Sequence, residues 1–154
     1  MQILVVSDSH GDVTTFRKLV RSKSKAEVVI FCGDGYNDFI EVSKEFPEKM
    51  FIGVRGNCDW CCSLPPLEIR TIAGKKFYIC HGHIQNVKFG LDGLKLLARK
   101  EEADIVLYGH THIAHTEYDG DMQIMNPGAL HRYDCSYGLI DIQNGQVLMN
   151  TAHL

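Results

Sequence analysis

Five short apolar runs, each followed at once by acidic, amide or histidine side chains, constrain the fold of this chain most. Each run contains four or five residues, mainly valine, isoleucine, leucine and phenylalanine, which is typical of a buried strand. The polar segments that end the runs are Asp8-Ser9-His10, Gly33-Asp34-Gly35, Gly56-Asn57-Cys58-Asp59, His81-Gly82-His83 and Gly109-His110-Thr111-His112. In open α/β sheets, sites lie at the carboxyl ends of the strands. We therefore expect an α/β fold in which these segments meet.

Glycine stands beside these polar residues and lets backbone segments approach one another closely. Asp8 and His10 are two residues apart, so their side chains would leave the same face of an extended segment. Any one of these side chains is also compatible with a structural hydrogen bond or a helix cap. Five such endings in order are difficult to obtain by chance, which favours one common site.

The remaining segments predict helices and hairpins. The expected helices, with their apolar positions, are 13–24 (Phe16, Leu19 and Val20, capped by Asp12), 37–46 (Phe39, Ile40, Ser43 and Phe46) and 91–101 (Leu94, Leu97 and Ala98). The expected strands are 3–6, 28–32, 51–54, 67–73, 76–80, 104–108, 113–118, 121–125, 137–142 and 146–151. Turns at Gly74-Lys75, Asp119-Gly120 and Asn144-Gly145 predict hairpins. About ten strands exceed one small open sheet, so we expect two packed sheets with helices outside.

Composition narrows the class of protein. With 154 residues, 45% of them hydrophobic, we expect residues 1–154 to form one globular domain. The net charge of -3 argues against a dedicated nucleic-acid binder. No apolar run reaches membrane-spanning length and no signal peptide is recognisable, so we expect a cytoplasmic protein with reduced cysteines. Cys58, Cys61 and Cys62 cluster, but no second cysteine pair stands at zinc-ribbon spacing.

Seven side chains are candidate metal ligands: Asp8, His10, Asp34, Asn57, His81, His110 and His112. Their donors are oxygen and imidazole nitrogen, which suit Mn, Ni, Fe, Zn or Mg and disfavour a thiolate site. Seven ligands exceed the needs of one ion and fit two ions that share a carboxylate, with Asp34 as the natural bridge because it has two oxygens. Two divalent ions with two carboxylates and a bridging hydroxide would be cationic, which favours phosphate esters as substrates.

In this order and spacing, the five segments resemble those of the calcineurin-like metallophosphoesterases, most of all the small single-domain phosphodiesterase branch. Gly109-His110-Thr111-His112 is the most specific piece, and Asn126-Pro127-Gly128 resembles a later loop of the family. The resemblance implies a four-layer αββα sandwich of two mixed sheets flanked by helices. It also implies one ion on Asp8, His10, Asp34 and His112, a second on Asp34, Asn57, His81 and His110, and hydrolysis by a metal-bridging hydroxide.

Other positions are expected to serve around the ligands. The resemblance assigns Asp34, Asn57 and His81 to catalysis, and Asn57 also to the substrate. Many relatives have histidine, the presumed acid, at the position of Cys58, which leaves the proton donor open here. Arg132 is a candidate phosphate contact or, equally, a surface arginine. Asp59, His83 and Cys58 are expected to support the ligands, and His115, His131 and His153 are unassigned.

Three functions compete at this point. The first is a two-metal phosphodiesterase acting on small phosphate esters, without a membrane partner and with homo-oligomerisation open. The second is a non-catalytic scaffold or protein-binding module of the type of the retromer subunit Vps29, which belongs to the same branch. Such a module would be expected to lose metal ligands, whereas this sequence has all seven. The third, a nuclease, would need a basic groove or a capping domain that the sequence does not clearly offer.

Overall fold

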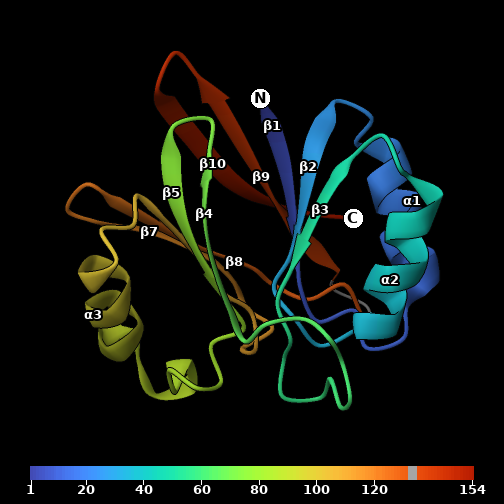
Figure 1. Ribbon diagram of the computed structural model, residues 1–154, viewed down its shortest axis with the longest axis horizontal. Helices are drawn as coiled ribbons and strands as arrows, with labels where there is room; N and C mark the ends of the chain where they lie inside the picture. Colours follow the sequence, from blue (N-terminus) through green and yellow to red (C-terminus); the bar gives the residue numbers. More distant parts are fainter. Residues whose placement is uncertain (132–134) are drawn as a thin grey trace.

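The computed structural model describes residues 1–131 and 135–154. These residues form ten strands in two five-stranded sheets that pack face to face. Helices cover the outer face of each sheet, which gives a four-layer αββα sandwich (Figure 1). The fold predicted from the sequence is therefore confirmed. Within the described residues, no helix is long and apolar enough to cross a membrane.

The first sheet has the strand order β10-β9-β1-β2-β3. Its strands are β1 (Gln2–Val6), β2 (Ala26–Phe31), β3 (Met50–Gly53), β9 (Ser136–Gln143) and β10 (Gln146–His153). The connections between β1, β2 and β3 are the helices α1 (Val13–Ser22) and α2 (Tyr36–Glu45), so these three strands run parallel. Strand β9 pairs antiparallel with β1, and β10 returns beside β9 at the edge.

The second sheet has the order β4-β5-β6-β8-β7. Its strands are β4 (Leu67–Ile72), β5 (Lys75–Cys80), β6 (Ile105–Leu107), β7 (Ala114–Asp119) and β8 (Met122–Pro127). The three inner strands run parallel, and the two edge strands are the antiparallel partners of hairpins. Between β5 and β6 the chain forms a short 3-10 helix, η1 (Val87–Phe89), and helix α3 (Asp92–Lys100).

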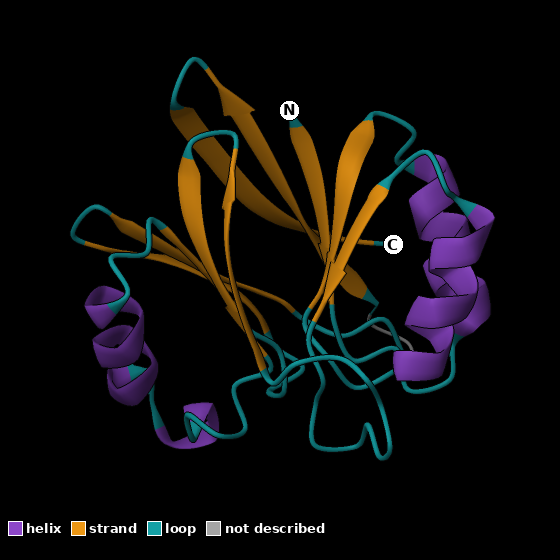
Figure 2. Ribbon diagram, in the orientation of Figure 1, coloured by secondary structure: helices purple, strands orange, loops and turns teal. Residues whose placement is uncertain are grey.

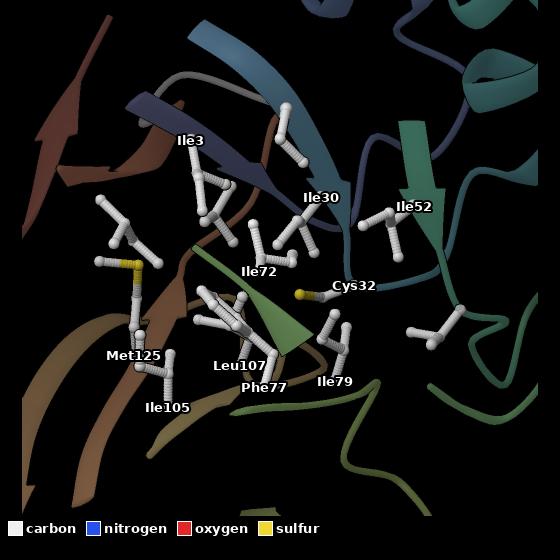
Figure 3. Close-up of a cluster of buried hydrophobic side chains, with 14 of the residues drawn as sticks. Ile3, Ile30, Cys32, Ile52, Ile72, Phe77, Ile79, Ile105, Leu107 and Met125 are labelled. Carbon is white, nitrogen blue, oxygen red and sulfur yellow. The ribbon is translucent and has the colours of Figure 1, made fainter. Parts of the chain in front are cut away.

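The core lies between the two sheets and beneath the helices. Strand β1 shows how alternation builds both layers: Ile3 and Val5 face the second sheet, whereas Leu4 and Val6 face α1 and α2. Figure 3 shows the inner layer, in which side chains of the first sheet such as Ile30 meet side chains of the second sheet. Strands in the middle of the sandwich are buried on both faces, and their sequences are therefore continuous apolar runs.

The helices agree with the predicted patterns in part. Asp12 caps α1 by accepting a hydrogen bond from the Thr15 N–H at 3.0 Å, as predicted. The apolar positions predicted for α1 are all buried. The prediction for Leu97 was wrong: the residue is 39% exposed, because α3 contacts its sheet mainly through Leu94 and Ala98. In α2 the buried positions include Asp38, which the apolar pattern did not indicate.

Two hairpin turns are displaced by one residue from their predicted positions. The turn at Asn144-Gly145 is as predicted, with both residues at positive φ. The first hairpin turns at Ala73-Gly74, because Lys75 already pairs with Ile72. Pairing of Asp119 with Met122 likewise leaves Gly120-Asp121 as the third turn.

The carboxyl ends of the parallel strands of both sheets meet at one end of the sandwich. Figure 2 shows the loops that follow these strands gathered there, away from the N-terminus of β1. The five polar segments that follow the apolar runs of the sequence lie in these loops. The fold therefore places them opposite one another across the two sheets.

Candidate metal centre

The structure brings the seven predicted ligands together. In the first sheet they follow β1 (Asp8 and His10), β2 (Asp34) and β3 (Asn57), and in the second they follow β5 (His81) and β6 (His110 and His112). The side-chain nitrogens of His10 and His112, which are 102 residues apart in sequence, lie 3.3 Å from each other. Neither sheet alone carries the complete set.

The backbone at the ligands is left-handed. Asp8, His10, Asp34, His110 and His112 all have φ values between 44° and 68°. Such values are uncommon outside glycine and cost on the order of 1–3 kcal/mol each. The expectation that Asp8 and His10 converge because they lie on an extended segment was therefore wrong. β1 ends at Val6, and a left-handed turn brings the two side chains together.

Close backbone approach explains two of the glycines. A Cβ atom at Gly56 would overlap Asp34 Oδ1, and one at Gly109 would overlap Ser7 Oγ. Any larger residue would have to displace a candidate ligand or the hydroxyl that holds one. These two glycines therefore allow the loops of the two sheets to close around the carboxylates.

Asp8 lies at the centre of the cluster and is fully buried. Its Oδ2 accepts hydrogen bonds from Ser7 Oγ at 2.5 Å and from the His110 N–H at 3.1 Å. Its Oδ1 has no partner with hydrogen-bond geometry among the described residues, although His112 Nε2 lies 3.0 Å away. The nitrogens of His10 and His81 lie 3.6 and 4.0 Å from the same oxygen. An orphaned buried carboxylate oxygen facing imidazole nitrogens fits a site for a cation.

Asp34 faces both halves of the cluster through one oxygen atom. Oδ1 accepts a hydrogen bond from the Cys58 N–H at 2.8 Å. Oδ2 lies 3.3 Å from His81 Nε2 and 3.9 Å from His10 Nε2. The sequence argument assigned both oxygens to metals, but the backbone of Cys58 occupies one. Oδ2 is therefore the oxygen of Asp34 that faces the imidazole nitrogens.

His81 is turned toward the site by a bond to the other sheet. Its Nδ1 lies 2.7 Å from the carbonyl oxygen of Cys32, so it carries the proton and donates. Nε2 then points its lone pair at Asp34 Oδ2 and at Asn57 Oδ1, which is 3.2 Å away. In the neutral ring these two oxygens and the nitrogen lone pair would repel one another, so either a proton on Nε2 or a metal ion is needed between them. The neighbouring ring of His110 lies 5.0 Å from that of His81, between centroids.

Burial and the neighbouring charges shift the pKa values of several residues in the cluster. Burial alone would raise the pKa of Asp8, but interactions with His10 and His112 outweigh it and hold the pKa far below its usual range. Burial opposes protonation of His81, yet its interactions with Asp34 and Asp8 prevail and raise its pKa. Burial and the charge of His81 lower the pKa of His110 to about 4. In the absence of metal, protons are thus held at some ligands and excluded from others.

Asp59 holds the site loops from behind. One carboxylate oxygen accepts hydrogen bonds from the N–H groups of Asp34 and Gly56, both at 2.8 Å. The other accepts from Gly35 and Tyr36, both at 2.9 Å. The loop after β3 is thereby fastened to the loop after β2, which carries Asp34. A role of Asp59 in supporting the ligands of a metal ion stays a prediction.

The structure adds supports that sequence reasoning missed or did not assign. Asp38 of α2 accepts hydrogen bonds from Ser9 Oγ at 2.6 Å and from the Gly11 N–H at 2.9 Å, which fixes the loop of Asp8 and His10. The one available signal was a charged residue beside Phe39 on the helix. The amide of buried Asn126 donates to the Gly109 carbonyl and to Thr111 Oγ1, which fixes the loop of His110 and His112. Its sequence motif had been noted without such a role.

The remaining predicted positions lie at the margin of the centre. His83 lies near His81, with 5.4 Å between ring centroids, but its buried Nδ1 has no hydrogen-bond partner within the described part of the chain. The previously unassigned His131 lies against His10, at 4.7 Å between centroids. The thiol of Cys58 can join His10 and Asp34 around one point. Arg132 lies outside the described residues.

A pocket of about 410 Å³ opens beside the centre. Three of the residues that line it are His10, Asp34 and Cys58, and the pocket continues to Tyr36 and Trp60. Taken with the oxygen and imidazole donors, the arrangement fits hard or borderline divalent ions and leaves room for a small molecule next to them.

Comparison with known proteins agrees with this geometry. The family model described as the calcineurin-like phosphoesterase superfamily domain matches residues 1–145. The probable metallophosphoesterase YsnB of Bacillus subtilis is 29% identical over 94% of this chain and 86% of its own length. The phosphodiesterase MJ0936 of Methanocaldococcus jannaschii is 30% identical, over 83% of each chain.

Solved structures show the same fold. A conserved uncharacterised protein of Streptococcus pneumoniae, described as a predicted phosphoesterase, superposes with a TM-score of 0.85 at 26% identity, over 99% of this chain and 88% of that one. Wild-type Vps29 of Entamoeba histolytica in complex with Zn²⁺ superposes with a TM-score of 0.77 at 21% identity, over 99% of both chains. At this identity the second likeness shows the fold alone.

Proposed function

The chain belongs to the calcineurin-like phosphoesterase superfamily, and from that premise we propose that it is a phosphodiesterase that hydrolyses small phosphodiesters with two divalent metal ions. The family and its relatives support a metal-dependent hydrolase of phosphate esters. The number of ions, the diester preference and the roles of individual residues are our proposal. We also propose that residues 1–154 act as one domain, because both sheets supply ligands to the same centre.

One observation supports the two-ion reading most: Asp34 Oδ2 lies near an imidazole nitrogen of each proposed ligand set, 3.9 Å from His10 Nε2 and 3.3 Å from His81 Nε2. In the proposed assignment, Asp8, His10, Asp34 and His112 hold the first ion. Asp34, Asn57, His81 and His110 hold the second. Mn²⁺ is our first choice, with Ni, Fe, Zn or Mg as alternatives, because these donors do not single out one metal.

When bound, two such ions would supply an activated water and positive charge for the oxygens of the phosphate. The protein supplies the alignment. His81 keeps its proton on Nδ1 through Cys32 and therefore presents a lone pair to the centre. Asn57 is exposed beside His81, where its amide can also contact a phosphate oxygen. Asp59 and Asp38 prevent the loops from moving apart during turnover.

The test is hydrolysis of bis(p-nitrophenyl) phosphate by the purified protein, first freed of metal and then supplied with each ion in turn. We expect activity only with added metal, and its loss on addition of a chelator. The variant Asp34→Ala should be inactive, whereas Asp121→Ala, in an exposed turn, should retain full activity. Full activity of a folded Asp34→Ala variant would refute the mechanism.

The alternative is a scaffold with the same fold, as the likeness to Vps29 permits. The presence of all seven ligand side chains around one centre favours the enzyme. A scaffold need not bind metal strongly or turn over esters, so absence of hydrolysis with every metal and every diester would favour that alternative.

The site of action is proposed as the cytoplasm. The thiols of Cys32, Cys58, Cys61, Cys62 and Cys80 are free. Free thiols in this number fit a reducing compartment.

A further inference from the structure

The pocket beside the centre has aromatic walls. Its lining includes Tyr36 and Trp60 together with His10, Asp34 and Cys58. At about 410 Å³ it falls within the range of roughly 300–1,000 Å³ common for small-ligand sites. A phosphodiester carries two substituents on its phosphate. Because this pocket adjoins the centre, it can receive one of them when the phosphate is held there.

Trp60 is exposed to an unusual degree for its size. Its residue exposure is 84%, although burial of an indole ring is strongly favourable. Single exposed apolar residues are common on protein surfaces, so exposure alone would carry little weight. Here the exposed ring belongs to a pocket that also contains a second aromatic residue and candidate metal ligands.

Both aromatic residues are anchored to the centre by the same carboxylate. Trp60 directly follows Asp59, which accepts hydrogen bonds from the N–H groups of Asp34 and Tyr36. Tyr36 Oη also lies 3.1 Å from Ser63 Oγ, which ties the first turn of α2 to the loop after Trp60. The backbone next to both rings is therefore held by contacts that also position Asp34.

The polar groups of the pocket do not favour a second anionic group, because three carboxylates and no lysine or arginine stand among the described residues that line it. The carboxylate of Asp59 accepts four backbone hydrogen bonds, and that of Asp38 accepts bonds from Ser9 and Gly11. Among the described residues that line the pocket there is no lysine or arginine. A flat, uncharged ring is the substituent that these walls accept best.

We propose that Tyr36 and Trp60 form a subsite for a planar aromatic group, such as a nucleobase, carried by the phosphodiester substrate. This inference rests on the proposed phosphodiesterase function and specifies its substrate class. All nucleobases can stack on an aromatic side chain, whichever base is present. Loss of that stacking typically weakens binding by about 5- to 150-fold.

The sequence provides a direct probe, because Trp60 is the only tryptophan. Adenosine monophosphate added to the metal-loaded protein should quench tryptophan fluorescence with saturation, whereas methyl phosphate should not. In Tyr36→Ala, a higher concentration of adenosine monophosphate should be needed. Tyr36→Phe, which keeps the ring and loses only the contact with Ser63, should stay close to wild type. No saturable quenching, or equal quenching by methyl phosphate, would overturn the subsite.

A second test compares two diesters with the same leaving group, the p-nitrophenyl esters of thymidine monophosphate and of methyl phosphate. Wild type should prefer the thymidine ester in kcat/KM. Trp60→Ala should reduce that preference by about 5- to 100-fold, and Trp60→Phe should restore most of it. Phe89, which is 93% exposed and lies outside the pocket, provides the matched control: Phe89→Ala should leave the preference unchanged.

The two tests separate the subsite from the proposed function. An equal loss on both esters in Trp60→Ala, or no loss on either, would overturn the subsite while the enzyme stands. Saturable quenching by adenosine monophosphate without hydrolysis of any diester would support the subsite and refute the phosphodiesterase.

Discussion

His81 Nδ1 lies 2.7 Å from the carbonyl oxygen of Cys32, a hydrogen bond that joins the end of β5 in one sheet to the segment after β2 in the other. Both groups are buried. The bond sets which ring nitrogen carries the proton and directs Nε2 at Asp34 and Asn57. The same hydrogen bond therefore joins the two sheets and orients the His81 ring toward the other candidate ligands.

The first prediction concerns pH. In the metal-free protein, Asp8 raises the pKa of His10, and Asp34 and Asp8 raise that of His81 despite its burial. Metal must displace these protons, so its apparent affinity should rise as the pH increases above about 6.5, the ordinary pKa of histidine, with proton release. His110, with a pKa lowered to about 4, is neutral in this range and releases none. Calorimetric titrations of Mn²⁺ in buffers of different ionisation enthalpy measure the release, and an affinity independent of pH would contradict this account.

The second prediction concerns the bridge. Wild type supplied with excess Mn²⁺ should hold two ions per chain. Asp34→Ala should hold fewer and should hydrolyse bis(p-nitrophenyl) phosphate at least about 10³-fold more slowly, because both water activation and charge stabilisation are impaired. Metal analysis and steady-state kinetics measure the two effects, with Asp121→Ala as the control. A wild-type stoichiometry of one under excess metal would remove the case for a bridge.

The third prediction concerns the proton donor. Without metal, burial and then the carboxylate of Asp34 raise the pKa of the Cys58 thiol. Bound cations would oppose that shift and favour the thiolate, which has no proton to give to an alkoxide leaving group. The rate should therefore depend steeply on leaving-group pKa, and Cys58→Ala should change nitrophenyl ester hydrolysis little. Cys58→His should raise the rate on alkyl esters, since general acid catalysis is typically worth about 10²–10⁴-fold.

A series of diesters of graded leaving-group pKa provides the measurement for Cys58. A flat series in wild type would mean that another group donates the proton. A collapse of nitrophenyl activity in Cys58→Ala, with metal content and fold intact, would contradict the role given to this residue.

The fourth prediction concerns Asp59. Asp59→Asn keeps the size of the side chain but replaces a carboxylate that accepts four backbone hydrogen bonds. An amide has only one acceptor oxygen, so some N–H groups lose their partner. We expect the metal-free protein to lose about 2 kcal/mol of unfolding free energy. Urea unfolding measures the loss, and Asp121→Asn is the control. An unchanged midpoint would show that water replaces these bonds without cost.

Much of the fold could be predicted because its signals are local. The continuous apolar runs, the Asp12 cap and the Asn144-Gly145 turn depend on a few neighbouring residues, and the structure agrees with each of them. Leu97 could not be placed correctly, because the sequence does not show how α3 sits on its sheet, where Leu94 and Ala98 are buried and Leu97 is not.

The candidate ligands were also visible in the sequence, because each follows one of five strands within a few residues. The sequence did not show which atoms of these ligands would lie close together. The Cys58 N–H donates to Asp34 Oδ1, which leaves Oδ2 facing His10 and His81. This arrangement depends on how the loops after β2 and β3 pack. The left-handed backbone at Asp8 and His10 likewise lies in a loop that the distant Asp38 holds through Ser9 and Gly11.

The sequence by itself therefore determined which side chains stand at the strand ends and in what order. Only the tertiary structure decided their geometry, the support by Asp38 and Asn126, and the pairing of Tyr36 with Trp60 in one pocket. The physical reason is that hydrophobic periodicity and turn preferences act over a few residues. Contacts such as that of His10 with His112 form only when two separate sheets pack.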